Sequence, residues 1–217
     1  MKIFTYQPPT IPWLDIRYQD RDIIVINKPA GLLSNPGRAE NTFDCAINRL
    51  LQRYPEAILV HRLDCATSGI MVFALNKKAE SNIKTQFQNR MTEKYYVALV
   101  QGVMSQDNGK IELAMKADKT QPPLQMIAED GKSATTYFEV LERRENATLV
   151  KLKPITGRTH QLRLHMKAFG HTILGDDFYG DENNIAASPR LCLHAEHLQI
   201  THPYRQQEMN FYSKHPF

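Results

Sequence analysis

The sequence is poor in cysteine and has no long hydrophobic run, and each of these absences excludes a class of protein. No stretch of roughly 18 consecutive apolar residues occurs, and the first residues lack a signal-peptide pattern, so we expect a cytoplasmic protein. The three cysteines, Cys45, Cys65 and Cys192, are odd in number and form no Cys-x-x-Cys pair. This argues against a disulfide framework and against a zinc ribbon. A protein kinase is also excluded, because Gly-x-Gly-x-x-Gly and Asp-Phe-Gly are both missing.

The composition is that of an ordinary globular protein, with 42% hydrophobic and 23% charged residues. A net charge of +4 permits a nucleic-acid partner without requiring one, so the distribution of the charge matters more. Between Asn146 and Gly175 there is no Asp or Glu. The same segment contains five basic residues, namely Lys151, Lys153, Arg158, Arg163 and Lys167. This clustering fits a phosphate backbone, and a solvated basic helix face explains it equally well.

A polar turn carries the strongest candidate for chemistry. It reads His61-Arg62-Leu63-Asp64-Cys65-Ala66-Thr67-Ser68-Gly69 and separates two apolar runs, 57–60 and 70–75. A carboxylate at Asp64, next to Arg62, has the ingredients of a nucleophile or general base that stays ionised at neutral pH. The alternative is that Asp64 only hydrogen-bonds its own backbone, which is the commoner use of an aspartate in a turn. Gly69 supplies a backbone angle that other residues adopt only at a cost.

Hydrophobic spacing predicts the secondary structure along the rest of the chain. Strands are expected over 22–27, 70–75, 93–100, 134–141 and 147–152. Helices are expected over 42–54 and over 77–90, the latter with Asn76 as N-cap. A third helix is expected from His160, with Thr159 as N-cap and Gly170 near its end. Asp107-Asn108-Gly109 is expected to form a hairpin turn, and residues 1–15 and 116–133 are expected to be irregular. On the last helix, His160, Arg163 and Lys167 would form a basic stripe.

Two motifs make the chain resemble the RluA-type pseudouridine synthases. They are His61-Arg62-Leu63-Asp64 followed by Thr67-Ser68-Gly69, and the run from Thr156 to His165, which reads Thr-Gly-Arg-Thr-His-Gln-Leu-Arg-Leu-His. Weaker matches occur in Asn27-Lys28-Pro29, in the strand of Lys94, Tyr96, Ala98 and Val100, in Gly175-Asp176-x-x-Tyr179-Gly180 and in Leu193-His194-Ala195. The resemblance extends from about Asp22 onward. It is strongest to the compact subgroup that modifies stem-loops of transfer RNA and of 23S ribosomal RNA, and the chain is too short at its start for the extra RNA-binding module of some relatives.

The resemblance implies an α+β catalytic fold, with a mixed, largely antiparallel sheet flanked by helices. Residues 1–21 would form an N-terminal arm and residues 22–217 the catalytic domain. The expected activity is isomerisation of a flipped-out uridine to pseudouridine. It needs no cofactor and no metal, because the reaction has no redox or energy input. The expected partner is structured RNA, bound by a monomer, with neither DNA nor a membrane involved.

The resemblance also assigns the site residues. Asp64 would be the catalytic residue, Arg163 would pair with it and keep it ionised, and Tyr96 would stack on the base. Arg62 would fill the space left by the flipped uridine. The expected RNA-binding residues are Arg62, His61, Lys28, Arg158, His160 and Lys167. For Tyr96, a core tyrosine with a satisfied hydroxyl is the ordinary alternative.

Two other classes of function stay open at this point. One is a noncatalytic RNA-binding or RNA-folding protein on the same scaffold, and the other is a hydrolase that uses Asp64 to release a base. A structural metal site is not expected, because His160 and His165 point to different sides of their helix and His194 and His197 lack a third ligand at a convincing spacing.

Overall fold

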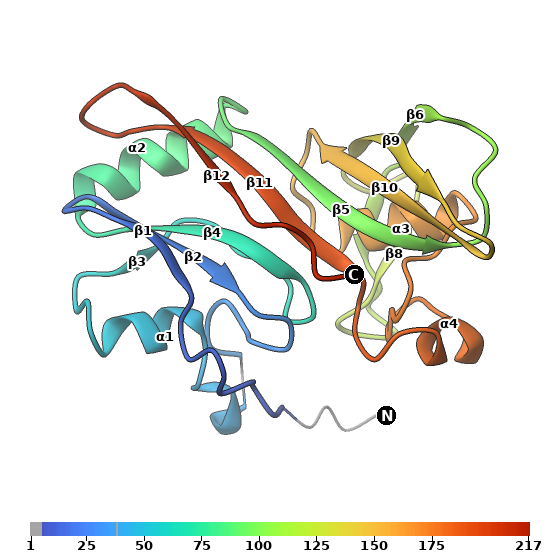
Figure 1. Ribbon diagram of the computed structural model, residues 1–217, viewed down its shortest axis with the longest axis horizontal. Coiled ribbons are helices and arrows are strands. Elements are labelled where there is room, and N and C mark those ends of the chain that lie inside the picture. Colours follow the sequence, from blue (N-terminus) through green and yellow to red (C-terminus); the bar gives the residue numbers. More distant parts are fainter. Residues whose placement is uncertain (1–5, 38) are drawn as a thin grey trace. The chain divides into compact units, whose positions relative to one another are not determined.

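The protein is represented by a computed structural model that describes residues 6–37 and 39–217 (Figure 1). The chain divides into two compact units. The first unit comprises Met1–Glu93 and Ala195–Lys214, and the second comprises Lys94–His194 and His215–Phe217. No helix among the described residues combines the length and the apolar character that crossing a membrane requires.

The first unit is built on an antiparallel sheet with one long helix. Its strands are β1 (Ile16–Gln19), β2 (Ile23–Lys28), β3 (Ile58–Leu59), β4 (Ser68–Ala74), β11 (Leu193–Thr201) and β12 (Glu208–Tyr212). The order is β1-β2-β4-β11, β3 also pairs with β4, and β12 also pairs with β11. Helix α2 (Lys77–Gln88) packs on this sheet, and α1 (Ala46–Leu51) follows a short 3₁₀ turn at Glu40–Thr42. Every residue of β4 is buried, so this strand is central, as its continuous apolar sequence predicts.

The core of the first unit lies between the sheet and α2. Its buried members are Ile23, Val25, Val60, Ile70, Val72, Ala74, Ala79, Ile83, Leu198, Ile200 and Phe211. The helix starts where the sequence predicts, because the side chain of Asn76 accepts a hydrogen bond from the Ala79 amide (2.9 Å). Gly69 has a φ of +122°, and a Cβ there would lie 2.3 Å from the carbonyl oxygen of Ala195. Glycine is therefore required at the point where the polar turn enters β4.

The second unit contains a four-stranded antiparallel sheet and two helices. The strands β5 (Glu93–Gln101), β10 (Ala147–Pro154), β9 (Thr135–Arg143) and β6 (Asn108–Glu112) lie side by side in that order. A separate two-stranded sheet pairs β7 (Met115–Ala117) with β8 (Gln125–Ile127). Helix α3 (Gln161–Ala168) packs against β8 and β10, and α4 (Glu182–Ala186) follows it. Both units are thus α+β with largely antiparallel sheets, and the predicted fold class is confirmed.

Several local predictions are wrong, and each error has a physical reason. The helix predicted over 42–54 is reduced to α1, because Phe43 is 71% exposed and does not join the buried stripe. The turn predicted at Asp107-Asn108-Gly109 does not form there. Asn108 and Gly109 lie inside β6, opposite Glu139 and Phe138 of β9. A pairing strand distant in sequence has overridden a local turn preference.

One segment that was expected to be irregular contains strands. The stretch 116–133 contributes most of the β7–β8 sheet, and β8 begins two residues after Pro123. The ordered sheet of the first unit begins before residue 22, because β1 lies inside the predicted arm and pairs with β2. The strands expected over 134–141 and 147–152 are β9 and β10, and they form an antiparallel pair.

Candidate active site

The loop that carries Asp64 connects β3 with β4 and is held through its backbone. The Ser34 hydroxyl donates to the carbonyl oxygen of Leu63 (2.7 Å) and accepts from the amide of Leu63 (3.0 Å). Ser34 and Leu63 are both buried. One hydroxyl therefore satisfies both backbone groups of the residue that precedes Asp64, which fixes the direction in which the Asp64 side chain leaves the loop.

Lys28 holds the other side of the same loop. Its ammonium donates to the carbonyl oxygens of Leu32 (2.6 Å), Pro29 (2.9 Å) and Cys65 (3.1 Å). Its exposed fraction is 0%. An RNA contact by Lys28 does not fit this burial, and the prediction of one is corrected: the ammonium satisfies backbone carbonyls inside the first unit. Sequence reasoning missed this because the loop of Cys65 is 37 residues away.

The carboxylate of Asp64 itself is left available. The turn is closed by the Thr67 amide, which donates to the backbone carbonyl of Asp64 (3.1 Å) and not to its side chain. Asp64 is half-buried, and within the described part of its own unit its carboxylate makes no hydrogen bond or ion pair. The ordinary use of a turn aspartate, bonding to its own backbone amides, is therefore not what Asp64 does.

The two residues before Leu63 differ in what their side chains contact. His61 accepts a hydrogen bond from the Val72 amide at Nε2 (3.0 Å), and its ring stacks on Phe87 with centroids 4.6 Å apart. These contacts attach the motif to β4 and α2 and give His61 a structural position. Arg62, by contrast, is exposed. Of the two predicted RNA contacts, Arg62 is exposed and His61 is half-buried.

Arg163, in the second unit, is a buried cation with a two-point carboxylate partner. It is 2% exposed, and its Nε and Nη2 donate to the two carboxylate oxygens of Asp176 at 2.8 and 2.5 Å. Nη2 also reaches Asp177 (3.0 Å), and the guanidinium lies 4.6 Å from the ring centroid of Phe178. Asp64 belongs to the first unit, so its predicted pairing with Arg163 stays a prediction.

Asp176 is the residue of this site whose importance sequence reasoning missed. Its exposed fraction is 0%, and its Oδ1 accepts from the amides of Phe178 and Tyr179, each at 3.0 Å. The buried carboxylate thus accepts hydrogen bonds from the Arg163 guanidinium and from two backbone amides. The signal was the Gly175-Asp176-x-x-Tyr179-Gly180 match, one of the weaker matches to the family.

Tyr96 lies on β5, opposite Leu152 of β10, and is half-buried. Its neighbour Tyr95 faces the other side of the strand, where the Lys151 ammonium lies 4.7 Å from its ring centroid. The two tyrosines therefore differ in surroundings, as the alternation predicts. Lys94 is two residues before Tyr96 and therefore lies on the same face of β5. Burial lowers the pKa of its ammonium group.

The start of α3 differs from the prediction. Its N-cap is His160, which adopts a left-handed conformation (φ 56°) with no side-chain cap, so Thr159 does not cap the helix. His160 is buried, and its Nδ1 lies 2.9 Å from the Tyr179 hydroxyl. An outward RNA contact by His160 does not fit this position. Within the predicted stripe, Lys167 is exposed, as is Arg158 in the preceding loop.

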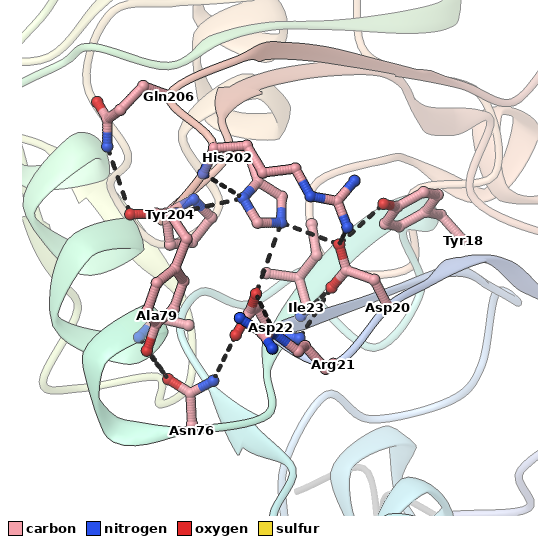
Figure 2. A network of polar contacts seen from close by, with 12 residues as sticks. Tyr18, Asp20, Arg21, Asp22, Ile23, Asn76, Ala79, His202, Tyr204 and Gln206 are labelled. Carbon is pink, nitrogen blue, oxygen red and sulfur yellow. Dashed lines mark hydrogen bonds and ion pairs between the residues drawn. The ribbon is translucent and has the colours of Figure 1, made fainter.

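A third cluster of titratable groups lies away from these motifs, in the first unit (Figure 2). Asp20, Asp22 and His202 each have a carboxylate oxygen or an imidazole nitrogen of the kind that can bind a metal ion, and these atoms all lie within 4.8 Å of one another. The Nδ1 of His202 accepts from the amides of Tyr204 (3.2 Å) and Arg205 (3.0 Å), and its Nε2 faces Asp20 at 2.9 Å. This pattern places the ring proton on Nε2, directed at the Asp20 carboxylate. The hydrogen bonds of this cluster therefore join the β1–β2 turn to the β11–β12 turn.

Comparison with known proteins agrees with the motifs. The sequence model of the family described as RNA pseudouridylate synthase matches residues 22–168. The dual-specificity RNA pseudouridine synthase RluA of Haemophilus influenzae is 49% identical over 219 residues, covering 100% of both chains. The protein of the same name from Escherichia coli is 50% identical over 213 residues, covering 97% of both chains.

A solved structure also resembles this one. Human RNA pseudouridylate synthase domain containing 1 superposes with a TM-score of 0.82 at 31% sequence identity, covering 97% of this chain and 87% of that one. The family match, the full-length relatives and the fold agree with one another. The resemblance read from the two motifs is thereby confirmed, and the chain belongs to the RNA pseudouridylate synthase family, as an isomerase of that class.

Proposed function

We propose that this isomerase converts uridine to pseudouridine in stem-loops of transfer RNA and of 23S ribosomal RNA, with Asp64 as the catalytic residue. The observation that carries the proposal is the state of Asp64. Its loop is fixed through Ser34 and Lys28, while its half-buried carboxylate is not consumed by the turn. A rigid backbone with an available carboxylate is what a nucleophile or general base requires.

The reaction exchanges one bond of the base for another. The bond from the ribose to N1 of uracil breaks, the base rotates, and C5 bonds to the same ribose carbon. The hydrogen on C5 leaves as a proton and N1 gains one, so atoms and electrons balance without a cofactor. Asp64 takes part by attack on the ribose, by attack on the base, or by removing a sugar proton.

The other predicted residues are proposed to act on the same uridine. Tyr96 stacks on the base, and Arg163, already held by Asp176, provides the positive charge that keeps Asp64 ionised. Arg62 fills the space left by the flipped base, and the exposed Arg158 and Lys167 contact phosphates. We propose further that residues 22–217 act as one catalytic domain of a cytoplasmic monomer, with neither DNA nor a membrane as partner.

The proposal is tested by tritium release from RNA that carries tritium at C5 of uridine. Unmodified transfer RNA transcripts and 23S ribosomal RNA fragments would be incubated with the wild-type protein and with Asp64→Asn. We expect release from the wild type alone, with pseudouridine as product and no free uracil. Free uracil would indicate a hydrolase instead, and RNA binding without release from either RNA class would contradict the proposed substrates.

A further inference from the structure

Gln161, the first residue of α3, has a buried side-chain amide in which every hydrogen-bonding position is used. Its Oε1 accepts from the Thr156 hydroxyl (2.7 Å) and from the Arg158 amide (3.1 Å). Its Nε2 donates to the Thr135 carbonyl (3.0 Å) and to the Thr136 hydroxyl (3.0 Å). An amide side chain has two donor hydrogens and one oxygen that accepts twice, so Gln161 is saturated.

These partners fix the orientation of the amide and attach two segments to one strand. A backbone amide only donates and a backbone carbonyl only accepts, so exchanging the oxygen and nitrogen of Gln161 would oppose two of the four bonds. The loop is also attached to β9 directly, because Ile155 donates to the Thr135 carbonyl (3.0 Å) and Thr135 donates to the Thr156 hydroxyl (3.0 Å). Loop 155–160 and the first turn of α3 are therefore held by the same pair of β9 residues.

A second residue of α3 contacts β9 on the same face. His165, four positions after Gln161, places its Nδ1 at 3.0 Å from the Thr136 hydroxyl. Residues four apart lie above one another on a helix. Arg163 lies two positions from Gln161, which is about 200° around the helix axis at 3.6 residues per turn. When one face of α3 is fixed to β9, the opposite face with Arg163 is directed toward Asp176.

The N-cap residue of α3 does not perform this task. His160 is left-handed there and provides no side-chain cap. The side chain of Gln161 reaches back to Arg158 and Thr156 in place of a cap. We propose that Gln161 is a positioning residue of the synthase, which sets the path of loop 155–160 and the rotation of α3, and thereby the placement of Arg158 and Arg163. This inference rests on the proposed function.

The experiment compares Gln161→Met with the wild type in single-turnover formation of pseudouridine on an unmodified transfer RNA transcript. Methionine has a similar length but none of the four hydrogen bonds. We expect the single-turnover rate at saturating enzyme to fall by about tenfold to a hundredfold, since displacement of a positioned group by 1 Å costs about that much. The RNA dissociation constant should rise by less than the rate falls.

Gln86 offers a matched control in the first unit. It is also a buried glutamine, and its amide donates to the Thr201 carbonyl (2.7 Å) and accepts from the Thr201 amide (2.8 Å). Gln86→Met should lower the Tm to a similar extent and leave the single-turnover rate of the folded enzyme at the wild-type value. If Gln161→Met likewise lowers only the Tm, Gln161 is structural and the proposal is overturned.

A second position keeps the test decisive should Gln161→Met fail to fold. Thr156→Val removes the hydroxyl that Gln161 accepts from, whereas Thr156→Ser keeps it. We expect the valine variant to lose rate and the serine variant to retain it, and equal rates for the two would overturn the proposal. A wild type that makes no pseudouridine on any RNA would be a failure of the proposed function. An active wild type with an equally active Thr156→Val would be a failure of this inference alone.

Discussion

Two turns of the first unit each present an aspartate, and the two carboxylates are in opposite situations. Asp20, between β1 and β2, accepts from the amides of Asp22 (2.8 Å) and Ile23 (2.9 Å) at Oδ1. Its Oδ2 is 2.9 Å from the Nε2 of His202 (Figure 2). Asp64, between β3 and β4, is anchored by the backbone groups around it and keeps its carboxylate out of those bonds. The same residue type in a turn thus fixes the fold in one place, and in the other its carboxylate takes no part in holding the turn, as the catalytic role that we propose for Asp64 requires.

The difference follows from what supplies the hydrogen bonds. In the Asp20 turn the side chain organises the backbone. In the Asp64 loop, other side chains, Ser34 and Lys28, organise the backbone and relieve the aspartate of that task. A catalytic carboxylate needs a fixed position and an unoccupied set of lone pairs at once, and anchoring through neighbours provides both.

The sharpest test of this comparison is Asp64→Asn. Removing a nucleophile or general base should lower the single-turnover rate by roughly 10²–10⁴-fold. The free energy of unfolding should change little, because the carboxylate takes no part in holding its loop. The rate is measured by tritium release and the stability by urea denaturation.

The control for this prediction is Asp118→Asn. Asp118 is a turn aspartate of the ordinary kind, whose Oδ1 accepts from the Thr120 amide (2.8 Å). Its replacement should leave the rate unchanged. If Asp64→Asn instead destabilised the protein strongly, the Asp64 carboxylate would help to hold its loop, and the Asp64 loop would not differ from the Asp20 turn.

The next largest effect is expected at Asp176, which extends the comparison to a fully buried carboxylate of the second unit. Asp176→Asn leaves the Arg163 guanidinium buried without its two-point partner. Breaking a buried ion pair in this way costs roughly 3–5 kcal/mol. Urea denaturation measures the loss, and activity should fall with it because Arg163 is no longer held.

Asp177 provides the comparison at the same guanidinium. Its side chain is 53% exposed and contacts Arg163 from the solvent side. Asp177→Asn should therefore cost no more than about 1 kcal/mol. Equal losses for Asp176→Asn and Asp177→Asn would contradict the assignment of Asp176 as the structural partner.

Ser34→Ala tests how the Asp64 loop is held. The substitution leaves the buried amide and carbonyl of Leu63 without the Ser34 hydroxyl, at a cost of about 1–3 kcal/mol. The rate should also fall, since Leu63 precedes Asp64. Ser81→Ala, at an exposed position on α2, serves as control and should change neither quantity. Loss of stability with an unchanged rate would show that the Asp64 loop does not depend on Ser34.

The sequence predicts the residues of the Asp64 loop but not the side chains that hold this loop in place. The His-Arg-Leu-Asp motif, the requirement for Gly69 and the buried strand after it are all local, so they can be read from neighbouring residues. The supports are not local. Ser34 meets Leu63 across 29 positions and Lys28 meets Cys65 across 37. No spacing rule connects residues that far apart, so Lys28 was expected to contact RNA.

The same reason explains the errors in the second unit. A buried arginine takes its partners from the tertiary structure, and the sequence did not indicate that Asp176, 13 positions away, holds the Arg163 guanidinium. The helix start was misplaced because Thr159 has the right chemistry for a cap. Gln161, with bonds to β9 across 25 and 26 positions, performs that task instead. Motifs identify which residues matter, whereas the side chains that hold them come from the fold.

The smallest effect concerns the Asp20 turn and its dependence on pH. Burial raises the pKa of Asp20, but the hydrogen bonds from Asp22, Ile23, Tyr18 and His202 outweigh it and lower the pKa from 3.8 to about 2. A carboxyl group with a lowered folded-state pKa adds stability that is complete above its unfolded pKa and is lost as the pH falls through the folded one. We therefore expect Asp20 to contribute at most about 2 kcal/mol to the free energy of unfolding at neutral pH, with the loss between roughly pH 4 and pH 2.

Urea denaturation across this pH range should show that the free energy of unfolding declines less steeply for Asp20→Asn than for the wild type. The two folded proteins should not differ in rate at neutral pH. An equally steep decline would mean that the Asp20 carboxylate is no better stabilised in the folded protein than in the unfolded chain, and the contrast with Asp64 would then lose its energetic basis.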